Sequence, residues 1–326
     1  MMQRTAIAGM VFSFLLLQGC DQSSGSQTAT APEYDAQDKA RLEQFIQQIK
    51  SELVYVQGGE FLMGDFGEEY GPEKLPYDGK KDSKPLHKVE LSSYSLGKFK
   101  TSNWQYQFYL SWNHLKGRVI KGSRNMANWQ EMAQTANTPA HVDWNEANQY
   151  CRWLGKITGL PFSLPTEAQW EYAARNRGQY VVAPTDDGTI RIEDRKGINV
   201  ATEDDVEGYS QSVGTSLGNL SPVPGDFRPP NPLGIYDMAG NGWEWMKDWY
   251  DPDYYSHSPV KDPQGPEKPV FKDSDGYFTK VLRSQDFSGP RRGLTMVRYN
   301  ADPESRYYPP VDKTVRCAVN SEQRIK

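Results

Sequence analysis

The sequence predicts one domain of mixed helices and strands in which irregular structure predominates. Clear helical periodicity is confined to three segments before residue 178, and the strand-like runs are short. Beyond residue 178, glycine, proline, aspartate and aromatic residues dominate and leave only short periodic runs. The 326 residues, 37% of them hydrophobic and 12% aromatic, supply enough apolar surface for a substantial core. No internal repeat or second domain boundary is visible, so we expect a single domain.

Residues 1–19 predict an export signal that ends at a lipidation site. Arg4 supplies a positive charge, and residues 6–17 form an apolar stretch that is too short to span a bilayer comfortably. The run Leu-Leu-Gln-Gly-Cys at 16–20 resembles a bacterial lipobox, in which Cys20 receives acyl chains such as palmitate and becomes the first residue. Several chains anchor a protein firmly, because each buried methylene contributes about 0.8 kcal/mol. A cleaved signal followed by an incidental cysteine is the alternative.

The residues after the signal predict which membrane anchors the protein and how the domain is tethered to it. Asp21 resembles the signal that keeps enterobacterial lipoproteins in the inner membrane. The periplasmic face of the inner membrane is therefore favoured, and the outer membrane is the alternative. Residues 20–35 are mostly small and polar and predict a flexible tether that starts at the lipidated cysteine. A net charge of −5 without a basic block argues against nucleic acid as a partner.

Residues 36–52 predict an amphipathic helix that packs on the domain. Leu42, Phe45, Ile46 and Ile49 recur there at three- and four-residue spacing. The domain itself is assigned to residues 53–322. Its first elements are a strand at 54–63 with a bend or bulge at Gly58-Gly59, a long surface loop at 64–86 and a second strand at 87–94.

Two further helices are predicted in the middle of the chain. Residues 145–158 carry a buried stripe made of Ala147, Cys151, Trp153, Leu154 and Ile157. A second helix opens after Pro165, with Thr166 as its N-cap. Gln169, three residues later, completes a capping box, which is a typical start of a helix.

Five segments, in order along the chain, resemble the signature blocks of the formylglycine-generating enzyme (sulfatase-modifying factor) family. They are residues 54–64, 100–106, 141–175, 231–245, and 281–283 with 315–319. The fourth ends in Gly-Asn-Gly-Trp-Glu-Trp, and the third contains Leu-Pro-Thr-Glu-Ala-Gln-Trp-Glu-Tyr. The resemblance implies a single α+β domain, a relative of the C-type lectin fold with little regular secondary structure.

The cysteines indicate a member of that family without its oxidase chemistry. The family's oxidase uses two nearby thiols late in the domain to bind copper, and soft thiolates select Cu(I). Here the three cysteines are Cys20, Cys151 and Cys317, so none lies between residues 152 and 316. We therefore expect no copper and no copper-dependent cysteine oxidation. In the resemblance, Cys151 and Cys317 match a structural disulfide, which an oxidising periplasm would preserve; two buried free thiols are the alternative.

The resemblance also implies structural calcium ions. Asn241 and Glu244 would supply side-chain oxygens and Gly242 a carbonyl, which are the ligand types that calcium takes. Trp243 and Trp245 would pack inward, and a purely structural turn without an ion is the alternative. A second, weaker set consists of Asn199, Val200, Glu207 and Tyr209.

A basic and aromatic set near the C-terminus lies where the family's peptide groove is found. It comprises Phe287, Arg291, Arg292, Arg298, Tyr299 and Arg306. These side chains could line a pocket for an acidic or extended peptide, or for a glycan. The alternative is a solvated basic loop whose arginines pair with surface acids.

These expectations combine into two functional hypotheses. The first is a membrane-anchored periplasmic lipoprotein that acts as a binding or assembly component of a cell-envelope system, with an envelope protein or peptide as its partner. Cysteine-free members of the family that serve in gliding motility and type VI secretion support it by resemblance. The second is an enzyme of the same superfamily with cysteine-independent chemistry, either oxidative or peptide-modifying. Function here rests on analogy between folds.

Overall fold

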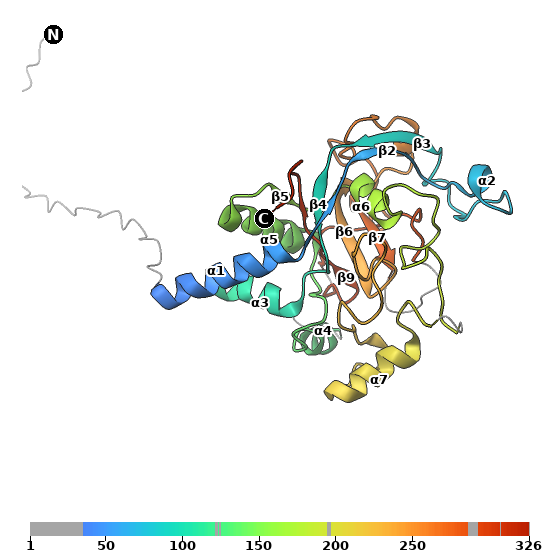
Figure 1. Cartoon of the computed structure of the whole chain (residues 1–326). Helices are drawn as coiled ribbons and strands as arrows, with labels where there is room; N and C mark the ends of the chain where they lie inside the picture. The colour runs from blue at the N-terminus through green and yellow to red at the C-terminus, as the bar shows by residue number, and fades with distance from the viewer. Residues whose placement is uncertain are drawn as a thin grey trace, which may run out of the picture. The chain divides into compact units, whose positions relative to one another are not determined.

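Figure 1 shows the computed structural model of the chain, which describes residues 35–120, 123, 125–193, 197–285, 293–306 and 308–325. The predicted signal, Cys20 and nearly all of the tether lie outside the described residues. The chain separates into two units, Met1–Leu42 and Glu43–Lys326. Among the residues described, no helix has the length and apolar character needed to cross a membrane.

The helices include all three that were predicted. They are α1 (Ala36–Ser51), α2 (Gly67–Tyr70), α3 (Asn103–Trp112), α4 (Met126–Met132), α5 (Trp144–Thr158), α6 (Glu167–Ala174) and α7 (Glu203–Val213), with short 3-10 turns η1 (Gly218–Leu220) and η2 (Tyr254–Ser256). The amphipathic pattern of α1 is confirmed, because Phe45 and Ile49 are buried. The Phe45 ring stacks on Phe108 of α3, with 4.2 Å between the ring centroids.

Short strands form three sheets. The strands are β1 (Leu53–Val56), β2 (Gly59–Met63), β3 (His87–Leu91), β4 (Tyr94–Gly97), β5 (Phe162–Ser163), β6 (Gly242–Trp249), β7 (Lys280–Gln285), β8 (Tyr299–Ala301), β9 (Lys313–Thr314) and β10 (Ala318–Val319). One sheet has the order β1-β4-β10-β5, a second pairs β2 with β3, and the third has the order β8-β7-β6-β9. The predicted strand at 54–63 therefore breaks near Gly58, and the one at 87–94 is divided between β3 and β4.

The core lies between these sheets and the helices that border them. Trp170 of α6, Tyr94 of β4 and Met246 of β6 belong to one apolar cluster, and each has no exposed surface. Trp245 and Trp243 belong to a second cluster, so their predicted inward packing is confirmed.

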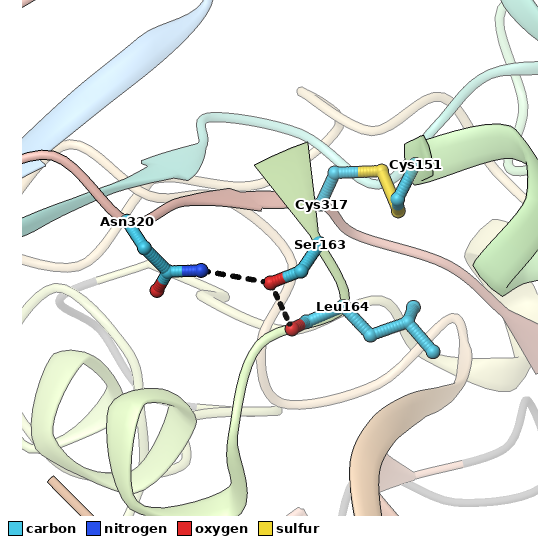
Figure 2. The surroundings of a disulfide bond; sticks show 5 residues. All are labelled: Cys151, Ser163, Leu164, Cys317 and Asn320. Atoms are coloured by element: carbon cyan, nitrogen blue, oxygen red, sulfur yellow. Dashed lines mark hydrogen bonds between the residues drawn. A yellow bond between two sulfur atoms is a disulfide. The ribbon is translucent and has the colours of Figure 1, made fainter. Parts of the chain in front are cut away.

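A disulfide links α5 to the C-terminal segment (Figure 2). Cys151 and Cys317 are bonded, which confirms the predicted pair, and they enclose a separation of 166 residues. Asn320 adds a polar contact, since its amide donates to Ser163 Oγ at 2.9 Å. The hydroxyl of Ser163 in turn donates to the Leu164 carbonyl. The end of the chain is thus fixed to both α5 and β5.

Candidate functional site

The charged part of the core is built on helix α6. All eight residues of this helix are buried, whereas a helix at the surface would keep a polar face toward water. The side chain of its N-cap, Thr166, accepts a hydrogen bond from the backbone N–H of Gln169, which confirms the predicted capping box. Glu167, Glu171 and Arg175 follow at intervals of four residues, so their side chains lie along one side of the helix.

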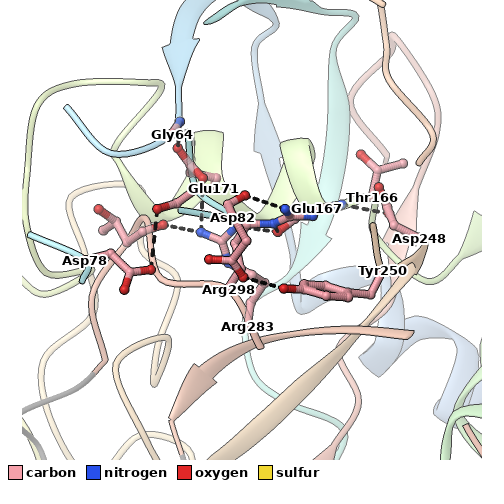
Figure 3. Close-up of polar contacts among 12 residues, drawn as sticks. Gly64, Asp78, Asp82, Thr166, Glu167, Glu171, Asp248, Tyr250, Arg283 and Arg298 are labelled. Carbon is pink, nitrogen blue, oxygen red and sulfur yellow. Dashed lines mark hydrogen bonds and ion pairs between the residues drawn. The ribbon is translucent and has the colours of Figure 1, made fainter. Parts of the chain in front are cut away.

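Two buried arginines from the C-terminal half bind these carboxylates (Figure 3). Arg283 of β7 donates to Glu167 Oε1 at 2.9 Å and to Glu171 Oε2 at 3.1 Å. Arg298 binds both oxygens of Glu167, from Nε at 2.7 Å and from Nη2 at 2.9 Å. The side chain of Arg283 is 0% exposed and that of Arg298 is 1% exposed, so these pairs are shielded from water and salt.

Opposite charges inside this cluster offset the cost of burying each charged group. Burial by itself would raise the pKa of Glu167, but Arg298 and Arg283 outweigh it and hold that pKa below its usual value. Burial lowers the pKa of each arginine, and the surrounding carboxylates overcome this and raise it instead. The two guanidinium groups are therefore internal counter-ions and present no charge to a ligand.

Asp248 lies beside this cluster, and its titration predicts a pH dependence of stability. Its carboxylate accepts a hydrogen bond from the Glu167 backbone N–H at 2.9 Å, and burial, followed by the charge of Glu167, raises its pKa to about 7. Between about pH 4 and pH 7 the folded protein therefore keeps a proton that the unfolded chain has lost. That contribution to stability falls as pH rises, by about 1.4 kcal/mol per pH unit.

Asp248→Asn keeps the hydrogen-bond acceptor but removes this titration. The unfolding free energy of the variant minus that of the wild type, both measured by urea titration, should increase progressively from pH 4 to pH 7. Asp275→Asn at an exposed turn is the control. A constant difference between Asp248→Asn and wild type over this range would show that Asp248 does not bind the proton.

The described members of the predicted basic groove do not form one pocket. Arg298 is buried against Glu167, so its assignment to an open groove is wrong. Tyr299 packs on Trp243, with 4.0 Å between the ring centroids. Arg306 is partly exposed and pairs with Asp302 and Glu304. This agrees with the alternative prediction of a solvated basic loop. Phe287, Arg291 and Arg292 lie outside the described residues.

The turn at 240–245 does not offer the oxygens predicted for a calcium ion. Asn241 Oδ1 accepts from the Val223 backbone N–H at 3.0 Å, and its amide nitrogen donates to the Val223 carbonyl at 2.8 Å. Glu244 is fully buried and ion-paired. The Gly242 carbonyl accepts from Lys100 Nζ at 2.6 Å. Because each predicted ligand group already has a protein partner, these residues do not fit the ion.

The second predicted calcium segment begins in a small cavity of about 40 Å³. Asn199, Val200 and Asn241 all line it, so residues from the two predicted sets do approach each other. The Asn199 side chain, however, is committed to its own loop. Its Oδ1 accepts from the Arg191 N–H at 2.7 Å, and its amide donates to the Asp186 carboxylate at 2.8 Å.

The other two residues of this predicted set lie on a separate helix. Glu207 and Tyr209 lie in α7, and neither lines the cavity. Thr202 is the N-cap of this helix, and its side chain accepts a hydrogen bond from the backbone N–H of Asp205 in a capping box. Glu207 is exposed on that helix. The structure therefore does not bring these two residues to the cavity that Asn199 lines.

An open groove that the sequence analysis did not predict lies around the N-terminus of α3. Its cavity volume is about 360 Å³. Aromatic and proline side chains share its wall with amides and carboxylates: Gln48, Glu52, Phe99, Lys100, Ser102, Trp104, Gln105, Asn137, Pro139, Pro224, Gly225 and Asp226. Phe99 and Trp104 are partly exposed there. The Lys100–Tyr106 block was visible in the sequence, but the residues that complete the groove come from three distant segments.

Residues 38–307 match the family described as the sulfatase-modifying factor enzyme 1-like domain. The formylglycine-generating enzyme of Streptomyces coelicolor is 32% identical over 257 residues, which cover 65% of this chain and 74% of that protein. The serine/threonine-protein kinase pkn1 of Chlamydia pneumoniae is 31% identical over 252 residues, which cover 73% of this chain but 34% of that protein. The chain thus spans about a third of the kinase relative.

Two solved structures have the same fold. PvdO from Pseudomonas aeruginosa superposes with a TM-score of 0.58 at 23% identity, covering 82% of this chain and 93% of that one. Treponema denticola variable protein 1 superposes with a TM-score of 0.51 at 20% identity, covering 82% and 95%. At these identities the likeness shows the fold alone, and it confirms the predicted mixture of helices and sheets. With the match over 38–307, the chain belongs to the sulfatase-modifying factor enzyme 1-like domain family.

Proposed function

We propose that this protein is a lipid-anchored component on the periplasmic face of the cell envelope whose domain binds or assembles a partner and does not oxidise cysteine. The observation that supports this most strongly is the disulfide, which consumes Cys151 and Cys317. Cys20, at the predicted lipidation site, is the remaining cysteine of the sequence. A pair of free thiolates, which a Cu(I) centre of this kind requires, is therefore not available.

The segment after Arg283, where the family resemblance places the copper-binding thiols, supports the same proposal. In β7, Arg283 is followed by Ser284 and Gln285, both buried. The Ser284 hydroxyl donates to the Gly240 carbonyl at 3.3 Å. No cysteine follows Arg283 before Cys317 in the sequence. Oxygen groups such as hydroxyls are hard ligands and do not replace thiolates in binding Cu(I).

The groove beside α3 is the surface that we assign to the partner. Partly exposed rings of Phe99 and Trp104 offer apolar contact area, and neighbouring amides offer hydrogen bonds, which together suit an extended peptide segment. The carboxylates that line it are Glu52 and Asp226, so a neutral or basic segment would be favoured over an acidic one.

An assay for formylglycine tests the loss of oxidase chemistry. Purified full-length protein is given Cu(I), oxygen and a cysteine-containing sulfatase peptide, and aldehyde is measured by mass spectrometry. The Streptomyces coelicolor enzyme is the positive control. We expect no aldehyde from this protein, and aldehyde formed at a rate similar to that of the control would refute the proposal.

Site-specific crosslinking in cells tests the partner surface. A photoreactive amino acid at Asn137, on the exposed rim of the groove, should give a discrete adduct, and one at exposed Asp275 should not. Trp104→Ala should abolish the Asn137 adduct while the protein stays membrane-bound. Equal adducts from both positions, or an adduct insensitive to Trp104→Ala, would exclude this groove as the binding surface.

Membrane fractionation of the same cells tests the anchor. We expect the wild type with the inner membrane and Cys20→Ser with the soluble periplasm. Recovery with the outer membrane would contradict the role assigned to Asp21, and unchanged membrane association of Cys20→Ser would contradict lipidation.

A further inference from the structure

The ammonium group of Lys100 is enclosed by oxygens of the 240–244 turn. Its Nζ donates to the Gly240 carbonyl at 2.5 Å and to the Gly242 carbonyl at 2.6 Å. Glu244 Oε1 lies 3.8 Å from the same nitrogen, and both of these side chains are 0% exposed. One positive charge thus faces two carbonyls and a carboxylate in the interior of the protein.

This set of oxygens has the chemistry of a calcium site, but a protein cation fills it. Calcium binds carbonyl and carboxylate oxygens at about 2.3–2.6 Å, a range that the two shortest Lys100 contacts reach. An ion and an ammonium group competing for the same carbonyls would repel each other strongly at low dielectric. Lys100 and a calcium ion therefore exclude each other at this turn.

The charges around Lys100 already balance without a metal ion. Glu244 also accepts from Arg316, through Nε to Oε2 and Nη2 to Oε1, each at 2.9 Å. Asp237 contributes the second carboxylate of this region and accepts from Asn241 at 2.6 Å. Two cationic and two acidic side chains sum to zero, so a divalent ion would add two uncompensated charges to a buried site.

We propose that Lys100 is a built-in substitute for the calcium ion of this turn, so that the domain is stable without metal. The ammonium group neutralises Glu244 and satisfies the two glycine carbonyls that a bound ion would otherwise satisfy. Because Lys100 lies just before Ser102, the N-cap of α3, the same contact links the start of that helix to the turn before β6. The substitution therefore combines neutralisation of charge with a link between segments 140 residues apart in sequence.

The second predicted calcium segment shows a parallel arrangement. Arg191 donates from Nε to the Gly197 carbonyl at 2.9 Å and from Nη2 to Asp186 Oδ2 at 2.8 Å. It also pairs with Asp187. The carboxylate of Asp186 is shared with the Asn199 amide. A basic side chain here binds oxygens of the loop that leads into the segment for which an ion was predicted.

Thermal unfolding of the purified full-length protein in detergent tests the proposal. The wild type should have the same Tm in EGTA and in millimolar calcium chloride. Lys100→Ala should lower the Tm in EGTA by roughly 10 °C, because Glu244 and two carbonyls lose a partner. Calcium should restore part of that loss, since the vacated oxygens then accept an ion. Lys116→Ala, which removes an exposed positive charge, is the matched control and should change neither value.

Three results would overturn the proposal. One is a wild-type Tm that falls when EGTA is added. The second is a Lys100→Ala variant whose Tm equals that of the wild type, or whose loss calcium does not reverse. The third does not depend on how the variant folds: one equivalent of tightly held calcium per wild-type chain, measured by elemental analysis after dialysis.

Discussion

Glu167→Gln is expected to destabilise the domain by roughly 3–5 kcal/mol, because it removes the charge that neutralises two buried arginines. The substitution keeps the volume and one oxygen of the side chain, so the loss reports on charge and not on a cavity. Arg283 would retain Glu171, whereas Arg298 would lose the carboxylate that it binds with two nitrogens. Urea unfolding monitored by tryptophan fluorescence measures the change.

Glu60→Gln is the matched control for this experiment. Glu60 also pairs with a basic residue, Lys88, at 2.8 Å, but both side chains are more than half exposed. An exposed pair of this kind contributes well under about 1 kcal/mol. If Glu167→Gln cost no more than Glu60→Gln, the buried cluster would not be a determinant of stability.

Removing the disulfide is expected to have an effect of similar size through the unfolded chain. A link between residues 166 apart restricts the unfolded chain, and the entropy of that restriction corresponds to about 5 kcal/mol. Cys151→Ala combined with Cys317→Ala should lower the urea midpoint accordingly, with a further loss from the small cavity left at two buried positions.

One single variant and a thiol count complete this experiment. Cys20→Ala leaves the disulfide intact and should unfold like the wild type, which separates the effect of the bond from loss of a cysteine. Two reactive thiols from Cys151 and Cys317 in denatured, unreduced protein would show that the bond is absent and would remove the basis of the prediction.

Features fixed by neighbours in the sequence could be predicted. The capping boxes and apolar stripes of α5 and α6 depend on residues three and four positions apart, and both helices appear where the sequence placed them. The same signal existed for α7, where Thr202 and Asp205 form a capping box. Its acidic first turn also suits the positive end of a helix dipole, whereas Glu207 and Tyr209 of the same helix were predicted to be calcium ligands.

Features fixed by distant residues could not be predicted. Arg298 was predicted to line an open groove, but it is buried against Glu167, which is 131 residues away in sequence. Lys100 and the Gly240 carbonyl are likewise 140 residues apart. Glu167, Glu171 and Arg175 lie four residues apart on one side of a helix, but this spacing does not show that the side lies in the interior.

The position of β10 has a consequence for how the protein is made. This strand, Ala318–Val319, lies between β4 and β5 and pairs with both. A polypeptide delivered N-terminus first, from a ribosome or through a translocation pore, therefore exposes one edge of β4 and one edge of β5 until residues 318–319 have emerged. Unpaired edges invite association with other chains during that interval. Synthesis cut short before residue 318 should consequently yield aggregates or fragments degraded by proteases.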